Sequence, residues 1–340
     1  MPTGSFSAAD FPAMPVKILI IKPSSLGDIV HTLPAVAAIR DAQPDAEITW
    51  VINSEWATLL RGNPDVDHLH IFPRSEFRGF GTPVQLLPWI RETRRLQPDA
   101  AIDFQGLLRS ALIAKVSRAE RTYGMSDGRE GSRLFYDKIA PVDRNEHAVD
   151  RYLKLAKAFG AGSNQSLRFP IPSGDALPRF DPFPGFVVLH PYARGRRKSI
   201  SPVIIQEFCR ALAPTRVVVV GKSHRKFSPP ENCVELTNQT TLLQLIWLLR
   251  HASFVISVDS GPMHIAAALT TNLISIHTWT DPRRVGPYNA AAFIWKNGTV
   301  MRVSDMDSAD ALRKGRPFRR QDVPAAADIA MKVLAQQPGV

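Results

Sequence analysis

The sequence has little cysteine and no long apolar run, and both shortages limit what the protein can be. Its 340 residues include two cysteines, Cys209 and Cys233, too few for a disulfide framework and typical of a reducing compartment. No apolar run reaches the ~18 residues that a membrane-spanning helix needs. The first basic residue is Lys17, so we expect no secretory signal, a flexible extension over residues 1–15 and a cytoplasmic protein.

Acidic residues are also scarce relative to basic ones. The sequence contains 31 Asp and Glu against 42 Lys and Arg, a formal net charge of +11. A basic protein attracts nucleic acid, an anionic membrane surface or phosphorylated substrates, and composition does not choose among them. The length predicts about two domains, and the 44% hydrophobic content is enough to build packed cores.

Several signatures of known chemistry are missing. The sequence has no G-x-G-x-x-G, no Walker loop, no G-x-S-x-G and no His/Cys cluster with zinc spacing. Two D-x-D pairs, Asp65/Asp67 and Asp305/Asp307, match the loose pattern of metal-dependent sugar transfer. Neither pair follows a convincing strand end, so we interpret both as structural.

Short β-branched runs alternate with helical patterns along the chain, which predicts α/β architecture with parallel sheets. A stretch rich in Pro, Gly and Ser interrupts the alternation and predicts a linker over 171–184. We therefore expect one Rossmann-like domain over 16–170, a second over 185–321, and a ligand cleft between them. A last helix within 322–340 is considered as packing back on the first domain. The expected strands are 16–21, 47–52, 100–104, 186–190, 216–220, 254–258 and 273–277, and the expected helices are 26–40, 55–61, 84–96, 107–116, 202–212, 242–251, 263–269 and 325–334.

The first candidate site is K-P-S-S-L-G-D-I-V-H over 22–31, which follows a predicted strand and opens a helix. Gly27 permits a close approach of the backbone, and the helix dipole favours the Asp28 carboxylate in the first turn. His31 lies three residues further on, on the same helical face. The segment is either a base directed at the cleft or a capping aspartate on an ordinary turn, and the spacing does not decide.

The second candidate is V-D-S-G-P-M-H over 258–264, again a strand end followed by a helix start. Free backbone N–H groups there bind anions, and we favour a diphosphate site over a plain turn with a solvent-facing His264. The third candidate is the loop 194–198, which has four cations in five residues. It is either a phosphate-binding loop or a solvated charged loop.

The fourth candidate is D-F-Q-G-L-L-R-S over 103–110. It lies at another strand end, where Gln105 and Gly106 are expected to face the cleft. The alternative is a tight turn that needs glycine.

Four segments, in this order along the chain, resemble the motifs of the lipopolysaccharide heptosyltransferases, glycosyltransferase family 9. They read S-S-L-G-D-I-V-H-T-L-P from Ser24, D-F-Q-G-L-L-R-S from Asp103, S-V-D-S-G-P-M-H-I-A-A-A-L from Ser257, and T-D-P from Thr280 followed by G-P-Y. The first motif is most similar to heptosyltransferase I, which adds the first heptose to the inner core.

The resemblance implies a GT-B fold of two Rossmann-like domains, with the acceptor on the first and the donor on the second. It implies inverting transfer from an ADP-heptose donor, which is a substrate, with no metal and no cofactor. Asp28 matches the catalytic base. Donor-binding positions are matched by Lys198, Asp259, Ser260, Gly261 and His264, with Arg194 in the basic loop beside them. The acceptor side is assigned to Arg109, to Arg74, Arg78 and Arg129 in weaker alignment, and to Ser25, Gly27, His31 and Gln105 beside the base.

This chemistry suits the residues. A carboxylate at a helix start is expected to have a low pKa and to take the acceptor proton late in the reaction. Lys198 and the helix start at Gly261 would meet the charge of the departing diphosphate. The implied acceptor, Kdo-bearing lipid A, is an anionic glycolipid of the inner leaflet, so the basic charge predicts peripheral contact with the inner membrane.

Three departures from the family pattern lie around the donor, and they motivate an alternative. They are Thr278-Trp279, Lys198-Ser199-Ile200 and the loop 221–226, which has no acidic residue. The alternative is the same fold with another nucleotide sugar, or with another envelope or secondary-metabolite acceptor. An inactive sugar-binding relative is a third hypothesis, which the presence of Asp28 disfavours. Nucleic-acid binding rests on charge alone, because the expected motifs are missing, so we expect no nucleic-acid partner.

Overall fold

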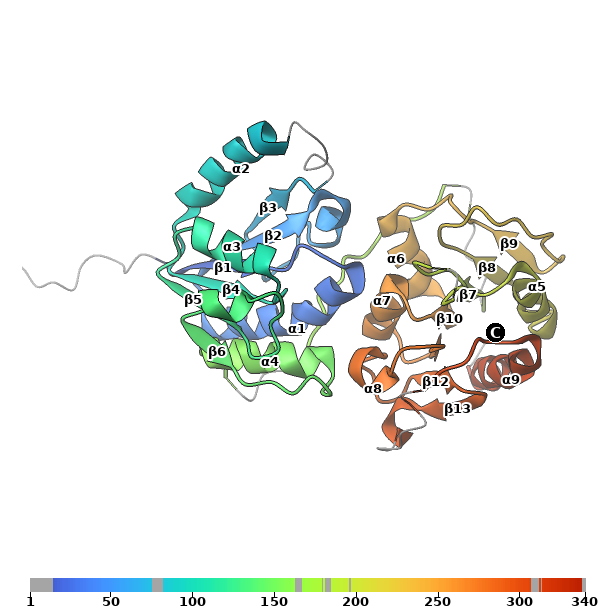
Figure 1. Ribbon diagram of the computed structural model, residues 1–340. Helices are drawn as coiled ribbons and strands as arrows, with labels where there is room; N and C mark the ends of the chain where they lie inside the picture. Colours follow the sequence, from blue (N-terminus) through green and yellow to red (C-terminus); the bar gives the residue numbers. More distant parts are fainter. Residues whose placement is uncertain are drawn as a thin grey trace, which may run out of the picture.

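The computed structural model describes residues 15–74, 82–162, 167–178, 180, 185–195, 197–306, 312 and 314–337, and the side chains of 82–85 are not described. Two α/β halves lie side by side, each built around its own sheet (Figure 1). Of the residues singled out above, Arg78, Arg196 and Asp307 fall outside the described residues, as do residues 1–14 of the expected N-terminal extension.

The first half is a parallel sheet of six strands in the order β3-β2-β1-β4-β5-β6. The strand order reverses between β1 and β4, and ligands of doubly wound sheets bind beyond the carboxyl ends of strands at such a point. The strands are β1 (Lys17–Ile21), β2 (Glu47–Asn53), β3 (His68–Phe72), β4 (Ala100–Asp103), β5 (Arg121–Met125) and β6 (Lys138–Ala140), and the helices are α1 (Leu26–Ala42), η1 (Ser54–Leu59), α2 (Thr82–Leu96), α3 (Leu108–Val116), η2 (Ser132–Phe135) and α4 (Ala148–Phe159).

Strand β1 explains why this sheet is covered on both faces. Its sequence, Lys-Ile-Leu-Ile-Ile, is apolar without alternation, as in strands of parallel sheets. Ile18 and Ile20 belong to the core cluster formed with α1 and α4, whereas Leu19 and Ile21 belong to the cluster formed with α2 and α3. The alternating side chains of one strand therefore hold helices on opposite sides of the sheet.

The second half has seven strands in the order β13-β12-β11-β10-β7-β8-β9, parallel except for β13. Helices α6 and α7 cover one face, and α5 and α9 cover the other. The strands are β7 (Val187–His190), β8 (Val217–Val219), β9 (Cys233–Glu235), β10 (Phe254–Val258), β11 (Leu273–Ile276), β12 (Phe293–Lys296) and β13 (Thr299–Arg302), and the helices are α5 (Pro202–Ala211), α6 (Leu242–His251), α7 (Gly261–Leu269), α8 (Pro282–Val285), η3 (Val303–Asp305), η5 (Arg320–Asp322) and α9 (Val323–Leu334).

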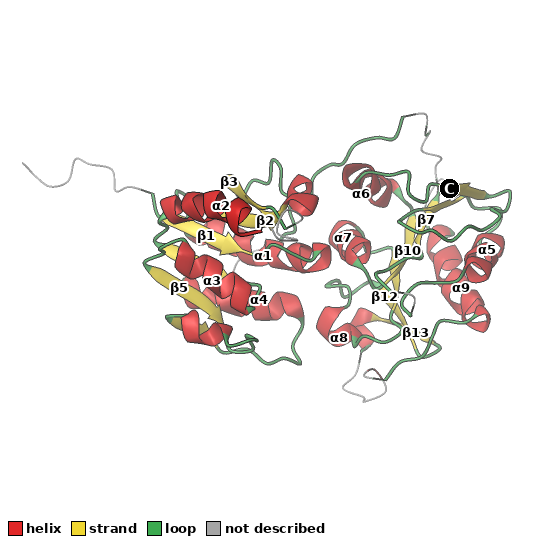
Figure 2. Cartoon of the chain, turned by 45° about the horizontal axis from the view of Figure 1, so that its top comes forward, coloured by secondary structure: helices red, strands yellow, loops and turns green. Residues whose placement is uncertain are grey.

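The two halves meet through their helices. α1 and α7 lie against each other between the sheets (Figure 2). One hydrophobic cluster contains buried side chains of α1 and α4 together with buried side chains of α6 and α7. The two halves are therefore joined by a packed interface of helices from both.

The last helix corrects one expectation. α9 does not pack back on the first half but packs against α5, β10 and β13 of the second. Its buried Ala326, Ala330 and Leu334 share a core with Phe208 of α5, so its apolar face is used by its own half. Among the described parts of the chain, no helix combines the length and the apolar character needed to cross a bilayer.

Candidate functional site

Asp28 lies in the first turn of α1, directly beyond the carboxyl end of β1. Its Oδ2 accepts hydrogen bonds from the Ser25 backbone N–H at 3.0 Å and from the Ser25 hydroxyl at 2.7 Å. Within the described part of the chain, no hydrogen bond reaches its Oδ1. Burial raises the pKa of Asp28, but the nearby Lys22 ammonium and the Ser25 hydrogen bonds outweigh it and hold the pKa below its ordinary value. One oxygen of an ionised carboxylate is thus anchored and the other is free.

Lys22 supplies the charge that keeps Asp28 ionised. Its side chain is 2% exposed, and its Nζ donates to the Phe104 carbonyl at 2.9 Å and to the Tyr152 hydroxyl at 2.8 Å. Burial disfavours the ammonium, but Tyr152 and Asp28 keep the pKa of Lys22 above its ordinary value. Lys22 has no role among the functions predicted from the sequence. The helix that carries Tyr152, α4, is also not among the predicted helices. The available signal was a lysine placed directly at the end of an apolar strand.

The starts of α1 and α7 approach each other closely at the interface between the halves. A Cβ on Gly27 would lie 2.4 Å from the His264 ring, and one on Gly261 would lie 2.7 Å from Leu26. Both glycines are therefore required by close approach. The Asp28 turn and the candidate anion site at Gly261, predicted separately from sequence, face each other in space.

Asp259, at the end of β10, joins several of the residues predicted to bind the donor. It is 7% exposed and accepts hydrogen bonds from Lys198 Nζ at 2.6 Å and from Thr280 Oγ1 at 2.7 Å. Burial raises the pKa of Asp259, but His277 and Lys198 outweigh it and lower the pKa to about 2. The T-D-P segment and the basic loop therefore converge on one carboxylate. Ser260, next in the chain, has its hydroxyl 3.2 Å from His190 Nδ1.

Two residues at which the sequence departs from the family pattern stabilise the conformation of the basic loop 194–198 through hydrogen bonds. The Trp279 indole donates to the Arg197 carbonyl at 3.1 Å, and the Ser199 hydroxyl accepts from the Ala193 N–H at 3.0 Å. Arg194 is exposed on this loop, whereas Lys198 is half-buried and points to Asp259. The loop thus combines one fixed cation with at least one exposed one.

Three histidines form a buried wall between the halves. The His31 ring lies 4.2 Å from that of His264 and 5.0 Å from that of His147, measured between centroids. His264 is 8% exposed, so the alternative of a solvent-facing His264 is wrong. Neither ring nitrogen of His31 has a hydrogen-bond partner among the described residues.

Burial keeps this wall uncharged. It lowers the pKa of His31 and of His264, and it lowers the pKa of His147 to about 4. His147 accepts from the Val149 N–H at Nδ1 and lies 3.1 Å from the Gly286 carbonyl through Nε2, which therefore carries the proton. Neutral imidazoles are therefore buried at the interface between the halves.

Three of the residues predicted for the acceptor side, Gln105, Arg109 and Arg129, lie beyond β4 and β5. Asp103 accepts from the N–H groups of Gln105 and Gly106, and Gly106 has the left-handed backbone (φ +67°) that this turn requires. The Arg129 N–H donates to the Gly106 carbonyl at 2.9 Å, which joins the two loops. Gln105 Oε1 is buried and has no described partner. Exposed Arg109 and Arg129 therefore flank this turn.

The other sequence candidates have plain roles or lie apart. Asp65 pairs with Arg168, and Asp67 pairs with Arg40, each at 2.6 Å, in agreement with a structural interpretation. Arg74 is exposed after β3. Among the described residues, no group of three or more His, Cys, Asp or Glu side chains is arranged to hold a metal ion.

Comparison with known proteins identifies the family. The model of "Glycosyltransferase family 9 (heptosyltransferase)" matches residues 88–312. Lipopolysaccharide heptosyltransferase 1 of Salmonella typhimurium is 27% identical over 80% of this chain and 92% of its own length. The lipopolysaccharide core heptosyltransferase OpsX of Haemophilus influenzae is 24% identical over 82% of this chain and 84% of its own length.

Solved structures agree on the architecture. The E. coli heptosyltransferase WaaC with ADP superimposes with a TM-score of 0.69 at 23% identity, covering 82% of this chain and 92% of that one. E. coli heptosyltransferase II gives a TM-score of 0.71 at 19% identity, over 94% and 99%. The predicted GT-B fold is confirmed. The chain belongs to glycosyltransferase family 9, the heptosyltransferases, and is a glycosyltransferase.

Proposed function

We propose that this enzyme transfers heptose from ADP-heptose to the Kdo-lipid A inner core of lipopolysaccharide, with inversion, without a metal, and with Asp28 as general base. The observation that carries the proposal is the free Oδ1 of an ionised Asp28, opposite the start of α7. The named relatives and the solved complexes with ADP and with ADP-2-deoxy-2-fluoro heptose support the choice of donor and acceptor class.

The reaction assigns a task to the residues of each half. Asp28 Oδ1 takes the proton of the acceptor hydroxyl while the hydroxyl oxygen forms a bond to the anomeric carbon. The bond from that carbon to the diphosphate breaks, and its electron pair leaves with ADP. Lys198, Arg194 and the N–H groups at the start of α7 stabilise the charge that develops on the diphosphate. Asp259 positions Lys198.

The halves divide the substrates. Residues 16–170 bind the anionic glycolipid through Arg109, Arg129 and the turn around Gln105, and residues 185–321 bind the nucleotide sugar. The enzyme works in the cytoplasm as a peripheral protein of the inner membrane, because the lipid portion of the acceptor stays in the bilayer.

The test is ADP release from ADP-heptose with Kdo-lipid A, for the wild type beside Asp28→Ala and Asp28→Asn. Acceptor-dependent release that falls by about 100-fold or more in both variants, with ADP affinity retained, is the expected result. Release from Asp28→Asn at the wild-type rate contradicts the role of Asp28. A wild type that binds ADP but releases none from ADP-heptose contradicts the choice of substrates.

A second candidate, another nucleotide sugar on the same fold, is favoured by Trp279, which is 43% exposed beside the basic loop, and by the loop 221–226 with its lack of acids. Competition binding with ADP and UDP separates the two. Preference for UDP supports the second candidate.

A further inference from the structure

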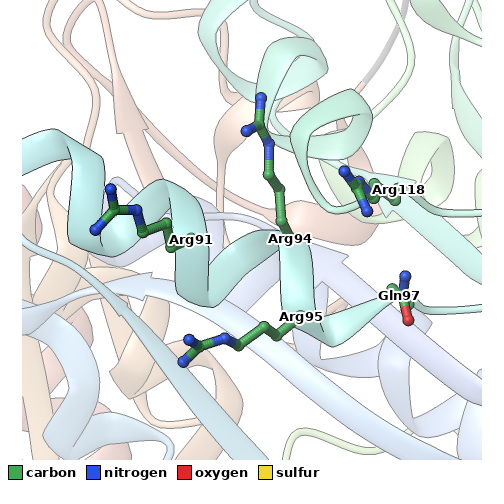
Figure 3. Close-up of a pocket in the computed structure, with 5 residues that line it drawn as sticks. All are labelled: Arg91, Arg94, Arg95, Gln97 and Arg118. Atoms are coloured by element: carbon green, nitrogen blue, oxygen red, sulfur yellow. The ribbon is translucent and has the colours of Figure 1, made fainter.

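A cluster of four arginines lies on the first half. Arg91, Arg94 and Arg95 come from the end of α2, and Arg118 lies two residues beyond the end of α3 (Figure 3). Together with Gln97 they line a hollow of about 340 Å³. α2 ends just before β4 begins, so the cluster lies near the amino ends of the strands, opposite the reacting groups.

Among the described residues, no acidic side chain forms an ion pair with this cluster. All four arginines are exposed, and none of their guanidinium groups has a hydrogen bond or an ion pair with a described residue. The charge of Glu92, also on α2, raises the pKa of His70 against the larger effect of burial. Glu130 accepts a hydrogen bond from the Leu108 N–H. Four unpaired guanidinium groups around one hollow are a surface for anionic phosphate groups.

The same two helices expose leucines. Leu87 is 52% exposed on α2, and Leu108 and Leu112 are 37% and 44% exposed on α3. Arg91, Arg94 and Arg95 follow Leu87 by four, seven and eight residues, so they continue its helical face. α2 and α3 are in contact. Their outer face therefore presents apolar side chains along its length and cations at one end.

We propose that this outer face of α2 and α3 is the surface by which the enzyme docks on a bilayer of anionic phospholipids. The arginines bind lipid phosphates, and the leucines insert at the boundary of headgroups and acyl chains, as in interfacial helices. The arginines alone would be enough to bind a soluble polyanion, and the exposed leucines would then have no role. The proposal rests on the proposed function, because only a lipid-borne acceptor needs such a surface.

The geometry connects this surface to the acceptor side. α3 begins at Leu108, next to the Gln105–Gly106 turn, and Arg109 lies in its first helical turn. A bilayer lying against α2 and α3 is therefore also close to the Gln105–Gly106 turn at the start of α3. An acceptor that stays anchored in the bilayer presents its sugars at this edge.

The test measures binding of the full chain to vesicles of phosphatidylglycerol and phosphatidylethanolamine, and to vesicles of phosphatidylcholine alone. The patch variant is Arg91→Gln/Arg94→Gln/Arg95→Gln/Arg118→Gln. The control variant removes four exposed, unpaired cations elsewhere: Arg144→Gln/Lys157→Gln/Arg210→Gln/Arg225→Gln. We expect the patch variant to lose affinity for the anionic vesicles by roughly tenfold or more, and the control by much less. A Leu87→Gln/Leu112→Gln variant is expected to lose affinity as well.

Equal losses in the patch and control variants overturn the proposal, as does a leucine variant that binds like the wild type. A patch variant that loses duplex DNA binding in the same proportion as vesicle binding makes the surface a general polyanion site and also overturns it. Turnover on a deacylated, water-soluble acceptor is expected to be unchanged in the patch variant. A wild type that docks through the patch yet transfers no heptose keeps the surface and contradicts only the proposed function.

Discussion

Asp28 and Asp259 lie in opposite halves of the molecule, and each interacts with a lysine in a different way. Lys22 is buried and gives its hydrogen bonds to Phe104 and Tyr152, so it acts on Asp28 only through its electric field. Lys198 is half-buried and bonds Asp259 directly at 2.6 Å. The first arrangement keeps a carboxylate ionised with one oxygen free, which suits a base. The second uses the carboxylate to hold a cation in place.

The largest effect is expected for Lys22→Met, which removes the cation that lowers the pKa of Asp28. Removing a buried cation leaves the Phe104 carbonyl and the Tyr152 hydroxyl without a partner and Asp28 without its compensating charge, so we expect a loss of about 3 kcal/mol in the free energy of unfolding. The pKa of Asp28 then rises, because the charge that lowers it is gone, and the acid limb of kcat/KM moves to higher pH. Urea unfolding and a pH–rate profile measure the two effects.

The matched control is Lys157→Met, which removes an exposed lysine of α4 and is expected to change neither measurement. An acid limb that stays in place in a folded Lys22→Met variant shows that Lys22 does not tune Asp28.

Asp259 gives the second prediction. Its folded-state pKa, about 2, lies below the ordinary value of 3.8, so its contribution to stability is present above pH 4 and is lost as the pH falls toward 2. We expect roughly 2 kcal/mol of unfolding free energy to disappear across this window in the wild type. Asp259→Asn is expected to be less stable at pH 7 and to lack this part of the pH dependence. A variant with the wild-type pH slope contradicts the assignment.

The close approach of α1 and α7 gives the third prediction. Gly27→Ala places a methyl group against the His264 ring and is expected to cost about 1 kcal/mol of unfolding free energy and to lower kcat. Gly261→Ala meets the flexible Leu26 side chain and is expected to cost less. Adding His264→Ala to Gly27→Ala removes the clash, so the double variant should lose less stability than the sum of the two single changes. If the stability losses of Gly27→Ala and His264→Ala simply add in the double variant, the close contact between these two residues is contradicted.

Ser25→Ala gives the smallest effect. It removes the hydroxyl bond to Asp28 Oδ2 but keeps the backbone N–H bond, and Lys22 remains. The acid limb of kcat/KM is expected to move upward by less than in Lys22→Met. A larger move than in Lys22→Met would place the main control of Asp28 in the hydrogen bonds and not in the charge.

The sequence predicted what depends on local pattern. Apolar runs located the central strands, and the turns that follow them located Asp28, Gly261 and the 103–110 segment, because carboxyl strand ends share one edge of a sheet. The role of Lys22 was not predicted, because its hydrogen-bond partners Phe104 and Tyr152 are 82 and 130 residues away along the chain. Strand β5, Arg-Thr-Tyr-Gly-Met, lacks the apolar run that marks β1, so it was missed. Hydrophobic periodicity shows that α9 has an apolar face, but it does not show which half of the molecule that face packs against.

The shared core of α1, α4, α6 and α7 has a consequence for recombining this protein with its relatives. A hybrid that joins the first half of one enzyme to the second half of another would place unmatched side chains at the seam, where Gly27 meets His264 and Gly261 meets Leu26. Exchange at the linker alone is therefore expected to give poorly packed hybrids. Transplanting the four central helices as one unit should keep the seam intact while the outer helices and loops are exchanged.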